Sequence, residues 1–340
     1  MKIKCSGCKK NINIKDGSYP KERSFSFLCP GCGKKIKINP IKKPKLSVDT
    51  KSEVNLFRNK LQKEILENNP SLPPTPDIFI KAKKLIKANG YSTKELSSLI
   101  SLDQAIAARV LKLANSAYFN FNPPVPSIDE ACLLLGEKNL ISIILVAQMS
   151  KMLDKELKGY KISAEDFFYH SVATATAAEL IAYEKMPLFH LDAFSAGLLH
   201  DCGKLVLNDY LIKEKEKFKS LIIEKKLSPW AAEKQIFGFS HSEIGLKLLE
   251  SWQLPKIQTQ AIGFHHNPMD SLSNELSYIL NAADFLSKKA GFSAENNWNN
   301  NLFYLSDEVK VFLKIEDYEL EEFSEKIREN VLIMTKDFNF

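Results

Sequence analysis

The sequence lacks any apolar run long enough to cross a bilayer. One of its longest apolar stretches, residues 140–147, is interrupted by Ser142 and falls far short of the roughly 20 residues that a membrane-spanning helix requires. The first residues, 1–5, also lack the apolar stretch of a signal peptide. These absences argue against an integral membrane protein, and we predict a cytoplasmic protein with no membrane insertion.

Glycine-rich phosphate loops and sustained alternation of apolar and polar residues are also missing beyond about residue 52. Their absence argues against a Walker-type or dinucleotide-binding fold and against a large sheet. Apolar residues instead recur at spacings of three and four, as in Ile106, Val110 and Leu113, and capping boxes precede several such segments. These boxes pair Ser92 with Glu95, Ser127 with Glu130 and Ser240 with Glu243. The sequence therefore predicts an all-α bundle of roughly 12–14 helices.

Acidic residues are scarce near the N-terminus, where residues 1–50 carry 13 Lys and Arg but only 3 Asp and Glu. The remaining residues carry 34 Lys and Arg and 38 Asp and Glu. Their formal net charge is therefore −4, whereas that of the first fifty residues is +10. A basic segment favours nucleic acid or another acidic partner, although a solubilising surface has the same composition. The contrast predicts a small basic part and a larger, mildly acidic part.

Cysteine is sparse as well, and four of the six cysteines form two Cys-x2-Cys pairs. The four are Cys5, Cys8, Cys29 and Cys32. Four thiolates at this spacing suit a tetrahedral zinc ion, and alternating residues between the pairs, such as 24–28, predict strands. Two disulfides are the alternative, which the missing secretory signal disfavours. We predict a β-type zinc ribbon over residues 1–40 and a linker rich in proline and lysine at 41–54.

Only six histidines are present, and all of them lie between His170 and His266. His200 and Asp201 are adjacent, and such a pair can reach one metal ion with both side chains. Ligands from other helices would complete a mono- or dinuclear site for phosphate chemistry. The candidate ligands are His170, His200, Asp201, His241, His265, His266 and Asp284. A histidine on an apolar helix is more often a hydrogen-bonded core residue, so this alternative stays open for each of them.

A lysine follows the His-Asp pair closely. Lys204 lies three residues after Asp201, so both side chains can face the same side of a helix. A lysine at this position could hold a phosphate or pair with Asp201. If the protein is a hydrolase, Asp201 and Lys204 are the candidate catalytic residues. The two remaining cysteines, Cys132 and Cys202, are expected to be small packing residues.

Several motifs, in this order and spacing, resemble the HDOD domain, a divergent branch of the HD-domain superfamily. The matching segments are residues 72–76, 109–118, 134–136, 197–204, 252–255 and 261–268. The resemblance implies an all-α HDOD domain, placed here at 55–290, in a bacterial regulatory protein. Members of this family are generally regarded as lacking a demonstrated enzymatic activity. Beyond the domain, residues 291–340 form a C-terminal extension whose pattern predicts two amphipathic helices.

The resemblance to the wider superfamily also implies roles for individual residues. The four metal-ligand positions of HD proteins correspond to His170, His200, Asp201 and Asp284. The extra ligands of dinuclear relatives correspond to His241 and one of His265 and His266, and the lysine after the His-Asp pair corresponds to Lys204. Phosphodiesterases of the HD-GYP type, which act on cyclic di-GMP, have an acidic residue and Gly-Tyr-Pro after the paired histidines. This chain continues instead with Asn267-Pro268-Met269, which argues against recognition of cyclic di-GMP more than against metal binding.

Three hypotheses follow. The first is a signalling and regulatory HDOD protein that acts through contacts with signalling proteins rather than as an enzyme. The second is a metal-dependent phosphohydrolase or phosphodiesterase with iron, manganese or zinc in the helical domain. The third is a nucleic-acid-associated regulator that uses the basic zinc ribbon. The family and the missing substrate motif favour the first, whereas the retained ligand set favours the second.

Overall fold

The structure is a computed structural model of the full chain. It describes residues 2–4, 11–13, 25–28, 32, 35–38, 64–65, 75–88, 92–116, 119, 121–271, 274–294 and 304–335. The chain divides into two compact units, Met1–Phe57 and Arg58–Phe340. Within the described ranges, no helix has the length and apolar character needed to cross a membrane.

The first unit contains two antiparallel strand pairs. Strand β1 (Lys2–Lys4) pairs with β2 (Asn11–Asn13), and Lys2 lies opposite Asn13. Strand β3 (Phe25–Leu28) pairs with β4 (Lys35–Ile38), and Phe25 lies opposite Ile38. Cys5, Cys8, Cys29 and the linker 41–54 lie outside the described residues, and Cys32 is an exposed turn residue. The zinc ribbon, its zinc ion and its contact with nucleic acid therefore stay predictions.

The second unit is helical, which confirms the all-α prediction for this part of the chain. Its helices are α2 (Asp77–Lys87), α3 (Thr93–Ser101), α4 (Gln104–Ala114), α5 (Ile128–Leu134), α6 (Gly136–Leu153), α7 (Ala164–Lys185), α8 (His190–Leu199), α9 (Cys202–Lys213), α10 (Lys215–Ile223), α11 (Pro229–Phe237), α12 (His241–Ser251), α13 (Lys256–Phe264), α14 (Glu275–Lys289), α15 (Asp307–Leu313) and α16 (Glu319–Thr335). The described residues thus form fifteen α-helices, more than the roughly 12–14 expected. Short breaks account for the difference, and one of them, between α8 and α9, lies at His200 and Asp201.

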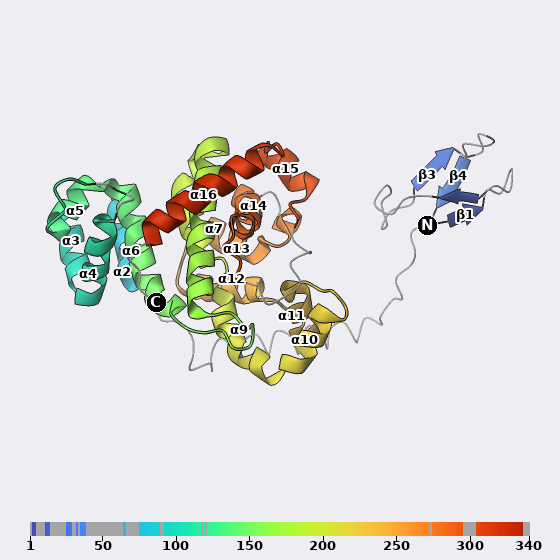
Figure 1. The fold of residues 1–340 in the computed structure, drawn as a ribbon, viewed down its shortest axis with the longest axis horizontal. Helices are drawn as coiled ribbons and strands as arrows, with labels where there is room; N and C mark the ends of the chain where they lie inside the picture. The colour runs from blue at the N-terminus through green and yellow to red at the C-terminus, as the bar shows by residue number, and fades with distance from the viewer. Residues whose placement is uncertain are drawn as a thin grey trace. The chain divides into compact units, whose positions relative to one another are not determined.

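Helices α2–α5 gather around α6 at one end of the helical unit, and α7–α14 form the larger body (Figure 1). The two groups meet along α6, which contacts α7 and α8 as well as α2, α4 and α5. A polar network reinforces the junction, because Lys83 Nζ on α2 lies 3.1 Å from Asp192 Oδ1 on α8 and 3.3 Å from Gln258 Oε1 on α13. The larger body therefore has a fixed position relative to α2.

Side-chain caps define several helix starts. The predicted capping boxes that begin α3 and α12 are complete, and Ser127 accepts a hydrogen bond from the Glu130 backbone N–H at the start of α5. At α12 the Ser240 backbone N–H donates to Glu243 Oε2 at 2.9 Å. Caps of this kind satisfy amides that have no partner within the helix. The cap at Ser240 also fixes the position of the first residue of α12, His241.

The C-terminal helices pack on the larger body. The two amphipathic helices predicted in this region are α15 and α16, and α16 lies across α7 and α14 (Figure 1). Phe323, Ile327 and Val331 are buried along one face of α16. Tyr278 of α14 stacks on Phe312 of α15, with ring centroids 3.8 Å apart. These contacts tie the last helices to α14, which carries Asp284.

Candidate metal centre

Five structural elements bring the predicted ligands together. His170 projects from α7 and Asp284 from α14, and both are buried. His200 and Asp201 form the junction between α8 and α9, His241 begins α12, and His265 and His266 directly follow α13. The residues form two groups whose ligand atoms lie within 4.8 Å of one another. The first group is Asp201, His241, His265 and His266, and the second is His170, His200 and Asp284.

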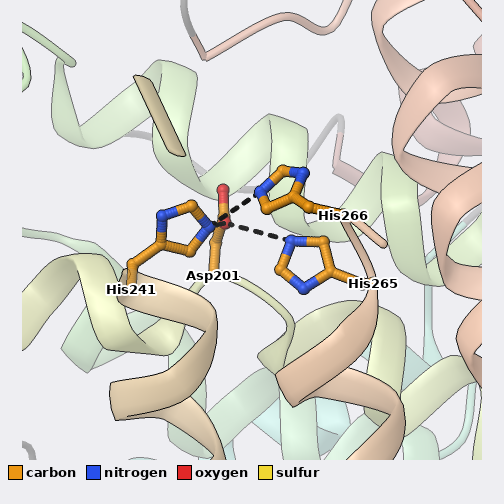
Figure 2. A group of neighbouring side chains, drawn as sticks. All are labelled: Asp201, His241, His265 and His266. Atoms are coloured by element: carbon orange, nitrogen blue, oxygen red, sulfur yellow. Dashed lines mark hydrogen bonds and ion pairs between the residues drawn. The ribbon is translucent and has the colours of Figure 1, made fainter. Parts of the chain in front are cut away.

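In the first group, three imidazole rings converge on the Asp201 carboxylate (Figure 2). His241 Nε2 lies 3.1 Å and His265 Nε2 lies 4.0 Å from Asp201 Oδ1. His266 Nε2 lies 3.0 Å from His241 Nε2. Ligand atoms that each lie about 2.1 Å from one ion are separated from one another by about 3–4 Å. The observed separations therefore fit a single ion held by this group.

The second group has the same spacing. Asp284 Oδ1 lies 3.3 Å from His170 Nε2 and 4.0 Å from His200 Nε2. Asp201 also faces this group, since its Oδ2 lies 3.6 Å from His170 Nε2 and 3.3 Å from His200 Nε2. One carboxylate thus offers Oδ1 to the first group and Oδ2 to the second. This is the arrangement of an aspartate that bridges two metal ions.

Hydrogen bonds on the far side of each ring set which nitrogen faces the centre. The Nδ1 atoms of His170, His200 and His265 lie 2.9, 2.8 and 2.7 Å from the carbonyl oxygens of Phe292, Gly197 and Ile262. A carbonyl can only accept, so each Nδ1 carries a proton and each Nε2 is the nitrogen that points toward the centre. A metal-binding imidazole is held in the same way. The rings are therefore oriented and protonated as ligands before any ion binds.

The inward-facing atoms lack conventional partners among the described residues. The Nε2 atoms of His170, His200 and His265, together with Asp284 Oδ1, are buried and make no well-aligned hydrogen bond, despite their short separations. Buried polar atoms are normally hydrogen-bonded because their desolvation is otherwise uncompensated. Buried donor atoms that converge in this way are the ones a cation could bind. The residues present therefore fit one or two metal ions.

Glu233 supports the centre and was not predicted from the sequence. Its side chain is fully buried on α11, and its Oε2 lies 2.8 Å from His241 Nδ1 and accepts the His241 backbone N–H at 2.6 Å. The Tyr160 hydroxyl donates to Glu233 Oε1 at 3.0 Å. A carboxylate behind a ligating histidine orients the ring and raises its basicity. In sequence Glu233 is eight residues from His241, and only its place on the apolar side of α11 hints at burial.

Two lysines neutralise the two carboxylates. Lys204 Nζ lies 2.7 Å from Asp201 Oδ2, and Lys288 Nζ lies 2.9 Å from Asp284 Oδ2. Of the two roles weighed for Lys204, the structure therefore shows pairing with Asp201. Lys288 was not predicted, although its spacing of four residues from Asp284 on one helix is the signal that could have found it.

The pKa values reflect these contacts. Burial opposes ionisation of Asp201, but His200 and Lys204 outweigh it and hold the pKa of Asp201 well below its usual range. Burial also disfavours the charged form of His241, yet Glu233 and Asp201 raise the pKa of His241 to about 9. Burial is the main cause that lowers the pKa of His265 to about 3, and the neighbouring imidazoles of His200 and His241 add to it. An ionised Asp201 and a neutral His265 are the forms that bind metal.

A cavity of about 400 Å³ opens beside the centre. His266 and Asp284 line it together with Lys288, Trp230 and Tyr304. Two candidate ligands thus border a space that can hold a small molecule. The sixth histidine, His190, is not part of the centre and pairs with Glu179 at 3.6 Å, which agrees with its exclusion from the predicted set.

The fold occurs in known proteins. An HDOD domain protein of unknown function from Geobacter sulfurreducens superposes with a TM-score of 0.67 at 24% identity, covering 84% of this chain and 99% of that chain. A structure from Shewanella amazonensis SB2B, described as a candidate metal-dependent phosphohydrolase, gives a TM-score of 0.54 at 18% identity, covering 82% and 99%. At these identities the similarity shows a shared fold.

Sequence comparison gives the family. An uncharacterized protein from Treponema pallidum (strain Nichols) is 28% identical over 221 residues, which are 63% of this chain and 41% of that protein. The chain therefore spans less than half the length of this relative. The HDOD domain family matches residues 72–268, more than half of the chain. Together with the helical fold, this match shows that the chain belongs to the HDOD domain family.

Proposed function

We propose that the helical unit is a metal-dependent phosphohydrolase built on an HDOD scaffold. The observation that carries this proposal is the shared carboxylate of Asp201, which faces two groups of ligand atoms through its two oxygens. With iron, manganese or zinc bound, such a centre would supply an activated water and charge neutralisation at phosphorus. The neighbouring cavity of about 400 Å³ gives a phosphate ester access to the ligands His266 and Asp284.

The residues of the chain then have distinct roles in this proposal. The carboxylates of Asp201 and Asp284 and the histidine Nε2 atoms hold the ions, and Glu233 fixes His241. Lys204 neutralises the buried carboxylate of Asp201 through its contact with Oδ2. The segment after His266 lacks the Gly-Tyr-Pro motif of the cyclic di-GMP phosphodiesterases. The proposal therefore covers phosphate esters other than cyclic di-GMP.

Hydrolysis of simple phosphate esters by the full-length protein tests the proposal. The wild type, loaded in turn with Mn²⁺, Fe²⁺ and Zn²⁺, would be assayed on p-nitrophenyl phosphate and bis-p-nitrophenyl phosphate. We expect turnover with at least one metal and a loss of roughly a hundredfold or more in an Asp201→Asn variant. The matched control is Asp209→Asn in α9, the helix that begins directly after Asp201, outside both ligand groups. A metal-loaded wild type that is inactive on both esters would contradict the proposal.

A second proposal is signalling through protein contacts, the first hypothesis drawn from the sequence. Its support lies in helices α2–α6, which expose large apolar side chains and border a cavity of about 750 Å³. Leu102, Leu133 and Leu134 are 77%, 65% and 52% exposed. Exposed apolar surface of this kind favours partner binding. In-cell crosslinking of the wild type and a Leu133→Glu variant would test it, and an unchanged crosslinking pattern would count against it.

A further inference from the structure

We propose that Lys288, rather than Lys204, is the lysine that binds the substrate phosphate at the metal centre. The inference rests on the proposed phosphohydrolase function and assigns a residue that contacts substrate. The proposal is based on the position of each lysine relative to the cavity. Lys288 lines the cavity of about 400 Å³ beside the centre, whereas Lys204 does not.

Lys204 is enclosed on the inner side of the centre. Its side chain is 1% exposed, and its Nζ lies 2.7 Å from Asp201 Oδ2 and 5.8 Å from the centroid of the Tyr160 ring. Withdrawing this ammonium toward a substrate would leave the buried Asp201 carboxylate without its closest cation, at a large desolvation cost. Lys204 is therefore paired with Asp201 and does not line the cavity.

Lys288 occupies the opposite position. It lies one helical turn after Asp284 on α14, and its Nζ contacts Asp284 Oδ2 at 2.9 Å. The other carboxylate oxygen, Oδ1, lies 3.3 Å from His170 Nε2 and faces the ligands. Asp284 therefore separates the metal side from the lysine by the width of one carboxylate. A phosphate that entered from the cavity would therefore meet this ammonium beside Asp284, which lines the same space.

Charge in the cavity strengthens the assignment. Among the described residues that line it, Lys288 is the only lysine or arginine, whereas Asp284 and Glu308 contribute carboxylates. An anionic substrate entering this space meets a single protein cation. A lysine ammonium is a compact donor that binds phosphate as a point charge. Lys288 would thus set both the affinity for phosphate and the direction from which the ester approaches.

Binding of inorganic phosphate to the manganese-loaded, full-length protein tests this assignment, with manganese per chain measured in parallel. We expect Lys288→Met to keep the wild-type manganese content and to weaken phosphate binding in calorimetry by roughly 10- to 100-fold. Lys288→Arg should restore most of the affinity, because it keeps the cation. The matched control is Lys289→Met, whose ammonium pairs with Glu321 on the surface. It should bind phosphate like the wild type.

The outcomes separate the inference from the function on which it rests. If the wild type binds neither manganese nor phosphate, the phosphohydrolase proposal fails and the assignment of Lys288 fails with it. If the wild type binds both and Lys288→Met binds phosphate equally well, only the assignment is overturned. Loss of manganese in Lys288→Met would also overturn it, because Lys288 would then be a positioning residue for Asp284. Weaker phosphate binding at full manganese content, restored by arginine, supports it.

Discussion

Helices α2–α6 and helices α7–α14 pack in the same way but bury different chemistry. Among the described residues of the first group, the buried polar side chains are the small hydroxyls Ser97, Ser116 and Ser150. Every buried histidine and every buried charged side chain in the described ranges lies in the second group, between His170 and Asp284. Burying a charge is costly unless it is paired or coordinates a metal.

This difference separates scaffold from site. In α2–α6 the buried side chains meet only the demands of packing, which many apolar combinations satisfy. In α7–α14 the ligands, Glu233 and the two lysines must all be present, because each buried charge depends on another. Substitutions in the second group should therefore change metal binding, stability and pH response together, whereas those in the first group should change stability alone.

The largest effect on stability is expected at the closest approach of two site helices. A Cβ added at Gly203 would lie 1.9 Å from the His241 carbonyl oxygen and 2.8 Å from the Gly245 backbone nitrogen. Because both obstacles are backbone atoms, Gly203→Ala must separate α9 from α12, and we expect a loss of about 3 kcal/mol in unfolding free energy. Chemical denaturation measures this loss. The control Gly245→Ala meets a side-chain atom, Ile262 Cγ2, at 3.3 Å rather than backbone at under 3 Å, and should cost clearly less.

Removing the charge behind His241 should weaken metal binding without unfolding the protein. Glu233→Gln keeps the size of the side chain but no longer provides a carboxylate to His241 Nδ1. We expect the affinity for metal to fall by roughly 10- to 100-fold, the usual effect of losing such a partner. Competition with a metal-sensitive dye would measure it. Glu250→Gln, an exposed change on α12, the helix that begins at His241, should bind metal like the wild type. Equal affinity in both variants would contradict the role of Glu233.

The buried histidines predict how stability depends on pH in the metal-free protein. Burial lowers the pKa of His265 to about 3 in the folded chain, whereas in the unfolded chain this histidine has its ordinary pKa of about 6.5. Below about pH 6.5 the unfolded chain therefore binds a proton at His265 that the folded chain does not bind. Unfolding free energy should therefore fall as the pH drops below about 6.5, by up to about 1.4 kcal/mol per pH unit for this residue. His170 and His266, whose pKa values are also lowered by burial, act in the same direction.

His241 acts in the opposite direction. Its pKa is raised to about 9, so its stabilising contribution is fully present below about pH 6.5 and is lost progressively as the pH rises from there through 9. Denaturation of chelator-treated protein between pH 5 and 10 should therefore give a maximum at about pH 6.5 to 7 and a decline towards pH 9. A His265→Asn variant should flatten the acid side of this profile. An unchanged acid slope in that variant would show that His265 is not the residue responsible.

The smallest effect is expected in the scaffold. Ile100 is fully buried on α3, and Ile100→Val should lower unfolding free energy by about 1 kcal/mol through the loss of one methylene. Metal content should not change, because no ligand lies in α2–α6 among the described residues. Elemental analysis would measure the metal content, and denaturation of the same sample would measure the unfolding free energy. A drop in metal content would show that the two groups of helices are coupled.

The sequence predicted the elements that depend on local signals. The capping boxes before α3 and α12 are present, and Cys132 and Cys202 are buried as expected. Local patterns suffice here because a cap or an apolar stripe involves residues only three or four positions apart. The break between α8 and α9 was not predicted, because the apolar run through Leu199 continues without a proline or a cap.

The sequence could predict which residues form the centre but not how they are arranged. The histidines were identifiable because they are few and confined to one part of the chain. The geometry depends on contacts between segments up to 122 residues apart, and no local sequence pattern encodes such contacts. Examples are the place of Asp201 between the two ligand groups, the carbonyl partners of the histidine rings and the contact of Glu233 with His241. Tyr160, which donates to Glu233 across 73 residues, had no identifiable signal for the same reason.

Metal content tests the central claim most directly. The full-length wild type and the Asp201→Asn variant would be purified without chelator, and metals per chain counted by elemental mass spectrometry. Any zinc held by the cysteines near the N-terminus would be common to both proteins and would cancel in the difference. We predict that the wild type carries about two more ions per chain than the variant. Equal metal content in two folded proteins would contradict the assignment of Asp201 as the bridge of a dinuclear centre.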